Sequence, residues 1–116
     1  MTEPDWQPIA TIENLRKRAN IMAKIRKFFC KRDILEVETP IMSHFTVTDP
    51  NINSIPIIYK SIGSNKEQKL YLQTSPEYAM KRLLANGSGA IFQTTKSFRQ
   101  GDVGRLHNPE FTMLEW

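Results

Sequence analysis

The last third of the chain constrains the fold most, because two strand-like segments flank a single polar loop there. Residues 90–94 (AIFQT) and 110–116 (EFTMLEW) are rich in aromatic, aliphatic and β-branched side chains, which suit a pleated, half-buried surface. The intervening stretch, KSFRQGDVGRLHNP, carries the glycine, proline and polar residues of a loop. This order predicts an antiparallel hairpin with a long, charged connection.

A second hairpin is predicted in the middle of the chain. Residues 55–59 (IPIIY) and 70–74 (LYLQT) have the composition of short strands, and the polar residues 61–69 connect them. Residues 41–54 are expected to be irregular, with TDPN as a turn signal.

A further strand is predicted over residues 34–39, where apolar or small side chains alternate with Glu36 and Glu38 until Pro40 ends the pattern. The two glutamates are expected on the solvent-facing side of an edge strand. Helices alternate with the strands, but the hairpins imply antiparallel pairing. The sequence therefore predicts an α+β fold, an antiparallel sheet flanked by helices.

Two helices are predicted. The first follows Thr11 as N-cap and ends near residues 32–33, with apolar side chains at three- and four-residue steps, namely Leu15, Ala19, Met22, Ile25 and Phe29. The second has Ser75 as N-cap, Pro76 at the first helical position and Gly87 as C-cap.

Length and charge narrow the class of protein. The chain has 116 residues, enough for one domain, and a formal net charge of +4. No apolar run approaches the roughly 20 residues that span a bilayer, and the single Cys30 is expected to be a packed thiol in a cytoplasmic protein. Half of the basic residues lie on the first helix, which is either a solvated face or a surface that attracts polyanions. These residues are Arg16, Lys17, Arg18, Lys24, Arg26, Lys27, Lys31 and Arg32.

Strand parity raises a question about Glu115. Alternation in residues 110–116 places Phe111, Met113 and Glu115 on one face of the strand. A carboxylate on an apolar face needs a cation or hydrogen bonds if it is buried. Either a ligand supplies that cation, or a lysine of the chain pairs with Glu115, or this face meets solvent.

The loop of the last hairpin carries three potential cations. Arg99, Arg105 and His107 flank one turn, and the guanidinium group matches phosphate and carboxylate oxygens. The cluster therefore suits an anionic ligand such as a nucleotide phosphate, although Asp102 opposes it and a basic surface loop is the alternative. Glu77 lies in the first turn of the second predicted helix, where a carboxylate interacts favourably with the helix dipole, so capping is its alternative role.

The sequence shows no spacing typical of metal ligands, and His44 is a lone histidine in a predicted loop.

Taken together, these strings resemble the catalytic domain of class II aminoacyl-tRNA synthetases. LEVETP after the first helix is similar to motif 1 (residues about 15–40), and SFR…RLHNPEFTMLEW is similar to motif 2 of the lysine branch (about 97–116). The string TSPEYAMKRLL is similar to that of the shorter elongation factor P lysine ligases. Those ligases also begin directly before motif 1, without the OB domain of lysyl-tRNA synthetases, as this sequence does. The resemblance implies that residues 1–116 are the N-terminal portion of a catalytic domain, truncated after motif 2 and without motif 3.

The resemblance also implies roles for residues of this chain. Arg99 would be the catalytic residue, holding the ATP α-phosphate and the amino-acid carboxylate. Glu77 would take the α- or β-ammonium of the substrate, and Glu115 the ε-ammonium. The other implied positions are Ser75 and Pro76 for the amino acid and Gln100, Gly101, Asn108 and Phe111 for ATP.

The implied activity is ATP- and magnesium-dependent activation of lysine or β-lysine as an adenylate, followed by transfer to a lysine side chain of elongation factor P. A homodimer is expected through motif 1. The alternatives are a lysyl-tRNA synthetase that charges tRNA and a non-catalytic dimerisation or binding module. One departure matters, because FRQG replaces the usual FRNE and places Gly101 where a glutamate is expected. Without motif 3, these 116 residues are not expected to catalyse or to hold magnesium alone.

Overall fold

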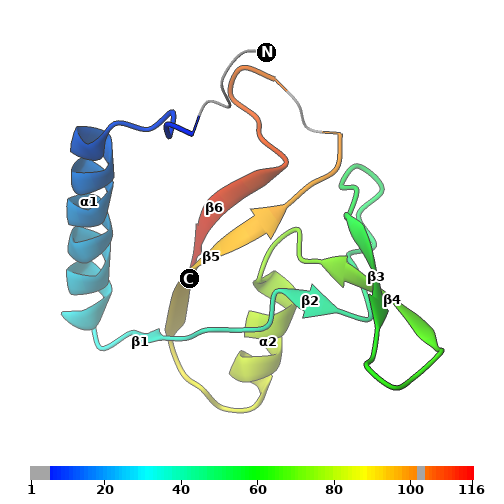
Figure 1. Ribbon diagram of the computed structural model, residues 1–116. Coiled ribbons are helices and arrows are strands. Elements are labelled where there is room, and N and C mark those ends of the chain that lie inside the picture. The colour runs from blue at the N-terminus through cyan, green and yellow to red at the C-terminus, as the bar shows by residue number, and fades with distance from the viewer. Residues whose placement is uncertain (1–5, 102–103) are drawn as a thin grey trace.

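The computed structural model describes residues 6–101 and 104–116, which form two helices and two three-stranded sheets (Figure 1). The strand orders are β1-β5-β6 and β2-β4-β3. Along the chain the elements are α1 (Ile12–Cys30), β1 (Leu35–Glu36), β2 (Met42–Ser43), β3 (Pro56–Lys60), β4 (Glu67–Leu72), α2 (Glu77–Ala85), β5 (Ile91–Phe98) and β6 (Glu110–Glu115).

The last hairpin is confirmed. β5 and β6 pair antiparallel, with Gln93 opposite Glu115 and Ser97 opposite Phe111. β5 runs to Phe98, four residues beyond the predicted end at 94. The strand is longer because Thr95 to Phe98 each have a partner on β6, so ladder pairing outweighs their polar character.

The first sheet is mixed, so the prediction of a single antiparallel sheet is wrong. β1 pairs in parallel with β5, with Leu35 opposite Ile91. The intervening chain builds the second sheet and α2 before it returns beside β1 in the same direction, a crossover that sequence spacing did not reveal. β1 is an edge strand, and both Glu36 and Glu38 are exposed as predicted.

The second sheet contains the predicted middle hairpin. β3 and β4 pair antiparallel from Pro56–Tyr71 to Lys60–Glu67. β4 begins at Glu67, three residues before its predicted start, since polar side chains of an exposed strand give no apolar signal. The predicted irregular segment contains β2, whose Met42 pairs with Leu72.

α1 begins as predicted, but it stands to one side of the sheet (Figure 1). The Thr11 hydroxyl accepts a hydrogen bond from the Asn14 amide at 3.2 Å. The helix ends at Cys30, two residues early, and Asp33 then takes a left-handed conformation with φ of 55°. Phe29 is the one side chain of α1 that is fully buried, and its ring stacks on Phe92 at 4.2 Å.

Two expectations about the helices are corrected. Cys30 is exposed rather than packed, because it lines an open hollow beside β1 together with Leu35 and Phe92. α2 has Pro76 at the N-cap position, one residue after the prediction, and the Ser75 hydroxyl still accepts from the Glu77 amide at 3.1 Å. Asn86 is the C-cap, and Gly87 follows it with φ of +86°.

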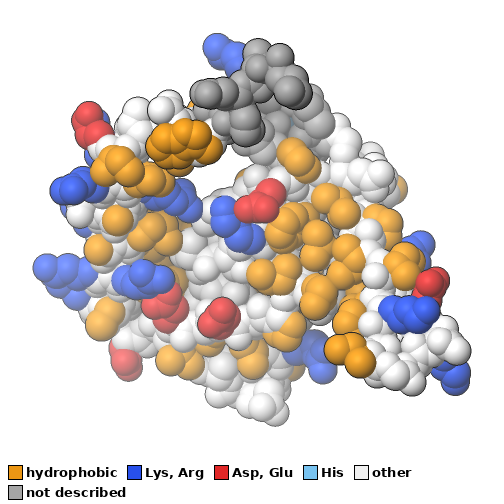
Figure 2. Space-filling view, in the orientation of Figure 1, with side chains coloured by type: hydrophobic (Ala, Val, Ile, Leu, Met, Phe, Trp, Pro, Cys, Tyr) orange, Lys and Arg blue, Asp and Glu red, His pale blue; other side chains and the backbone are white. Residues whose placement is uncertain are grey.

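The basic side chains of α1 are all exposed, as a solvated face requires, and Figure 2 shows lysine and arginine side chains gathered over this helix. Some have partners: Lys17 pairs with Glu13, Arg26 pairs with Glu36 at 3.0 Å, and Arg18 donates to the Thr112 hydroxyl. Across the described residues, no helix is both long and apolar enough to cross a membrane.

Candidate functional site

The carboxylate of Glu115 faces the start of α2 rather than open solvent. Ser75 Oγ donates to Glu115 Oε2 at 3.2 Å, which joins the last position of β6 to the residue just before α2. Glu115 is half-buried, and Met113 and Phe111 occupy the same face of β6, as strand parity predicted. The structure gives Glu115 a hydroxyl partner but no ion pair among the described residues.

Glu77 lies in the first turn of α2 and pairs with a lysine one turn later. Lys81 Nζ is 2.6 Å from Glu77 Oε1, and both side chains are about half exposed or more, at 64% for Lys81 and 49% for Glu77. The hydrogen bond and charge of Glu77 are the main causes that raise the pKa of Lys81, and the charges of Tyr78 and Glu115 add to them. Lys81 is therefore a cation at neutral pH.

Glu77, Lys81 and Glu115 line one cavity of about 320 Å³. Its walls come from α2, from the start of β5 and from the end of β6, and they include the apolar side chains of Met80, Ile91 and Trp116. Met80 and Ile91 are 4% exposed, so core side chains form part of the cavity wall. Two carboxylates and one ammonium thus share a mostly apolar hollow, which suits a ligand with amine groups and an aliphatic chain.

Arg99 follows β5 directly and is held by the hairpin. Its amide donates to the Pro109 carbonyl at 2.9 Å, and its guanidinium carbon lies 5.2 Å from the centre of the Phe111 ring. Arg99 Nε is buried and has no hydrogen-bond partner among the residues described. A buried guanidinium nitrogen without a protein acceptor fits a site for an anionic ligand.

Of the remaining positions predicted for ATP, Gln100, Gly101 and Asn108 lie in the loop, and Phe111 lies on β6. Gln100 is exposed, and its amide donates to the Asn53 carbonyl at 2.8 Å. Gly101 has φ of +88°, and a Cβ built there would meet no atom within 4 Å. Asn108 is exposed, while Phe111 is half-buried beneath Arg99.

The predicted cluster of three cations does not form as one group. Arg105 and His107 are exposed, and a bridge between Gly104 and His107 shapes their part of the loop. No contact in the described part of the loop joins either side chain to Arg99. Asp102 lies outside the described residues.

Two residues of this region were missed from sequence. Lys81 could have been found, because Glu77 and Lys81 have the four-residue spacing of neighbours on a helix. Gln93 could not, because its place depends on strand register. It lies opposite Glu115, is 1% exposed, and donates from Nε2 to the Thr39 hydroxyl at 2.8 Å, which ties the segment after β1 to the centre of the sheet.

The side chains that could hold a metal ion are few. Within residues 6–101 and 104–116, no three or more His, Cys, Asp and Glu side chains are grouped closely enough to form a site. His44 is exposed, in the loop that follows β2.

Comparison with curated proteins identifies relatives across the whole chain. The protein of Vibrio cholerae serotype O1 named "Elongation factor P--(R)-beta-lysine ligase" is 53% identical over 116 residues, which is all of this chain and 36% of that protein. Proteins of the same name from Salmonella paratyphi B and Buchnera aphidicola are 58% identical over 111 residues and 56% identical over 116 residues. The match to the Salmonella paratyphi B protein includes 96% of this chain and 34% of that protein. The match to the Buchnera aphidicola protein includes 100% of this chain and 36% of that protein.

The chain thus spans about a third of the length of the curated relatives it matches. The family described as "tRNA synthetases class II (D, K and N)" matches residues 6–116, nearly the whole chain. This match covers the hairpin with Arg99 and Phe111, the cavity with Glu77 and Glu115, and α1 with the strand after it. The chain belongs to the class II tRNA synthetase family of the D, K and N type.

Proposed function

We propose that the full-length protein is a cytoplasmic ligase that activates lysine or β-lysine with ATP and transfers it to a lysine side chain of elongation factor P. The relatives from Vibrio cholerae and Salmonella paratyphi B carry a name that states this acceptor and (R)-β-lysine. Because this chain spans about a third of their length, the activity of the whole protein is a proposal.

One observation carries the proposal: Glu77 and Glu115 line a single cavity whose other walls are largely apolar. A lysine or β-lysine molecule has two ammonium groups separated by an aliphatic chain, so two carboxylates in an apolar hollow match it. In this arrangement Glu115 takes the ε-ammonium, assisted by Ser75, and Glu77 takes the α- or β-ammonium. Pro76, whose ring is fully buried, lies between Ser75 and Glu77 and anchors this part of the polypeptide.

Arg99 and Phe111 supply the nucleotide side of the proposal. The half-buried Arg99 guanidinium suits the α-phosphate of ATP and the carboxylate of the amino acid, because both offer oxygen pairs to its planar fork. Phe111 offers an aromatic face for adenine, and Gln100, Gly101 and Asn108 form the edge of the site. Arg99 and Glu115 lie at opposite ends of the β5–β6 ladder, so the substrate would extend along β6.

The proposed chemistry has two steps. A carboxylate oxygen of the amino acid attacks the α-phosphorus of ATP, the aminoacyl-adenylate forms, and pyrophosphate leaves. The neutral ε-amine of the acceptor lysine then attacks the acyl carbon, an amide forms, and AMP leaves while the amine loses a proton. Arg99 would stabilise negative charge on the α-phosphate oxygens in the first step, and positioning in the cavity would supply much of the rate.

Magnesium is expected with ATP, but the described residues contain no cluster that would hold it. The isolated 116 residues are proposed to be inactive, because Arg99 would contact the phosphates from one side only.

The test is amino-acid activation by the full-length gene product. Lysine or (R)-β-lysine should each be tried for exchange of labelled pyrophosphate into ATP, followed by transfer of the labelled amino acid to purified elongation factor P or to tRNA. Transfer to elongation factor P, with none to tRNA, supports the proposal. Transfer to tRNA alone would favour a lysyl-tRNA synthetase, and no exchange with either amino acid would favour a non-catalytic module.

A further inference from the structure

One of the two carboxylates in the cavity already forms a salt bridge with a lysine of the chain. Lys81 lies one turn after Glu77 on α2, its Nζ is 2.6 Å from Glu77 Oε1, and it lines the same cavity as Glu115. The other titratable groups that act on Lys81 are Tyr78 and Glu115. All but Glu115 are on α2, and Glu115 reaches the cavity from β6.

The charges of the cavity then do not match a substrate with two ammonium groups. Two carboxylates and one ammonium leave one negative charge to receive two positive ones. If the substrate ammonium reaches Glu77 while Lys81 stays, two cations compete for one carboxylate and repel each other. Lys81 is 64% exposed, so its long side chain has room to turn into solvent when it leaves Glu77.

We propose that Lys81 is a resident competitor that holds Glu77 in the free protein and is displaced when the α- or β-ammonium of the substrate binds. This inference rests on the proposed function, because it takes lysine or β-lysine as the ligand. A substrate that offers a second ammonium can replace Lys81, whereas one that lacks it leaves the Lys81–Glu77 pair intact. The pair therefore lowers the affinity for diamino acids and leaves the affinity for simple amines unchanged.

A second pair in the chain shows what is particular to Lys81. Lys17 and Glu13 on α1 have the same spacing and the same 2.6 Å distance, and both are largely exposed. That pair lines none of the cavities around the amine site, so its lysine competes with no ligand. An exposed pair of this type contributes about 0–1 kcal/mol, equivalent to a change in affinity of up to about fivefold.

The test compares four full-length proteins: wild type, Lys81→Met, Lys81→Arg and Lys17→Met. Calorimetric titration with lysine should give two- to fivefold tighter binding for Lys81→Met, because the competitor is gone. Lys81→Arg retains a cation and Lys17→Met is remote, so both should bind lysine as wild type does. Titration with 6-aminohexanoate, which keeps the ε-ammonium but has no α-ammonium, should be unaffected by Lys81→Met.

The other outcomes each overturn the inference. Weaker lysine binding by Lys81→Met would mean that Lys81 positions Glu77 for the substrate. Unchanged binding would mean that the pair is only a surface contact, and an equal gain for 6-aminohexanoate would mean a general effect of charge. If wild-type protein bound neither lysine nor β-lysine, the proposed function itself would be contradicted. The outcomes above, in which wild type does bind lysine, contradict only the inference about Lys81.

Discussion

At the scale of single residues, the two cavity glutamates differ in their surroundings. Glu115 is half-buried and bonded to Ser75, whereas Glu77 is 49% exposed and bonded to Lys81. Loss of one partner from a desolvated charge pair costs about 2–4 kcal/mol, and exposure to water lowers that cost. Glu115 should therefore contribute more to lysine recognition than Glu77.

We predict that both Glu115→Gln and Glu77→Gln lower kcat/KM for lysine in the full-length protein. The loss of transition-state stabilisation should be about 4 kcal/mol for Glu115→Gln and about 2 kcal/mol for Glu77→Gln. Each variant keeps the shape of the side chain but removes its charge. ATP affinity, measured by titration, should change little and serves as the control. Normal lysine kinetics in both variants would contradict the assignment of the cavity.

Gly101 is the second residue with a specific consequence. Its φ of +88° is unfavourable for any residue with a Cβ, although the space around it is open. Gly101→Ala should lower the free energy of unfolding by about 1 kcal/mol, as measured by urea denaturation. Gly104→Ala is the matched control, because Gly104 lacks the positive φ and its added Cβ would lie 3.8 Å from the His107 ring. Equal effects of both changes would show that strain at Gly101 is not the cause.

At the scale of elements, α1 is joined to the sheet mainly through one aromatic contact. Phe29 is 4% exposed and stacks on Phe92, and the Trp116 ring is 6.0 Å away. The neighbouring Phe28 is 49% exposed, and its ring lies under the Arg32 guanidinium at 3.6 Å. The arrangement of α1 and β5 thus depends on Phe29 rather than on the length of the apolar stripe.

Phe29→Ala is expected to lower the free energy of unfolding by about 3–4 kcal/mol, because it removes a fully buried ring and leaves a cavity. Phe28→Ala should cost much less, since half of that ring is already in water. Denaturation curves of both variants in the full-length protein measure the difference. Similar losses for the two would show that α1 is held by contacts other than this stack.

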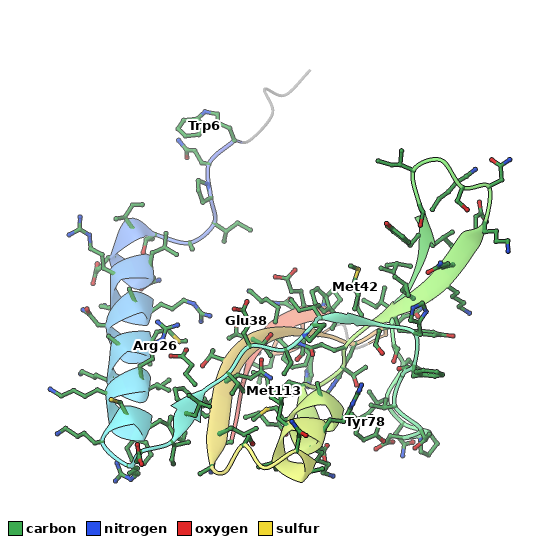
Figure 3. The ribbon with its side chains drawn as sticks, turned by 90° about the horizontal axis from the view of Figure 1, so that it is seen from below. Trp6, Arg26, Glu38, Met42, Tyr78 and Met113 are labelled. Carbon is green, nitrogen blue, oxygen red and sulfur yellow. The ribbon has the colours of Figure 1, made fainter. Side chains whose placement is uncertain are left out.

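At the scale of the whole molecule, much apolar surface remains uncovered. The radius of gyration is 17.7 Å, whereas a compact domain of this length has about 13 Å. Figure 3 shows Trp6 on the N-terminal arm, away from the sheets, and its side chain is 83% exposed. On α1, Ile12, Leu15 and Ile21 are 65%, 46% and 56% exposed. Apolar surface on this scale is typical of a region that another part of the protein or a second copy covers.

We predict that the full-length protein is a dimer that uses α1. Light scattering after size-exclusion chromatography should give twice the chain mass at micromolar concentration. Ile21→Glu should shift the protein toward monomer, because it places a charge on the exposed apolar stripe, whereas Lys24→Glu on the same helix should not. A monomeric wild type, or dimers unaffected by Ile21→Glu, would contradict this interface.

Local sequence signals determined the two helices and both hairpins. Thr11 and Gly87 mark helix ends through backbone geometry, and the alternation in residues 110–116 fixed the face of Glu115 before any partner was known. The family strings around Arg99 and Glu77 were also local, so the positions of the candidate site could be predicted. Each of these signals depends on residues within about four positions of one another.

Only the tertiary structure decided which of these pieces meet. The parallel pairing of β1 with β5, the early start of β4 and the short β2 depend on partners far along the chain, for which spacing carries no signal. The same holds for the bond from Ser75 to Glu115, which joins residues 40 positions apart, and for the Lys81 ammonium in their cavity. The two carboxylates could be read from the sequence, but only the packing of α2 near the end of β6 brings them to one cavity, because long-range packing sets distances that local propensity cannot encode.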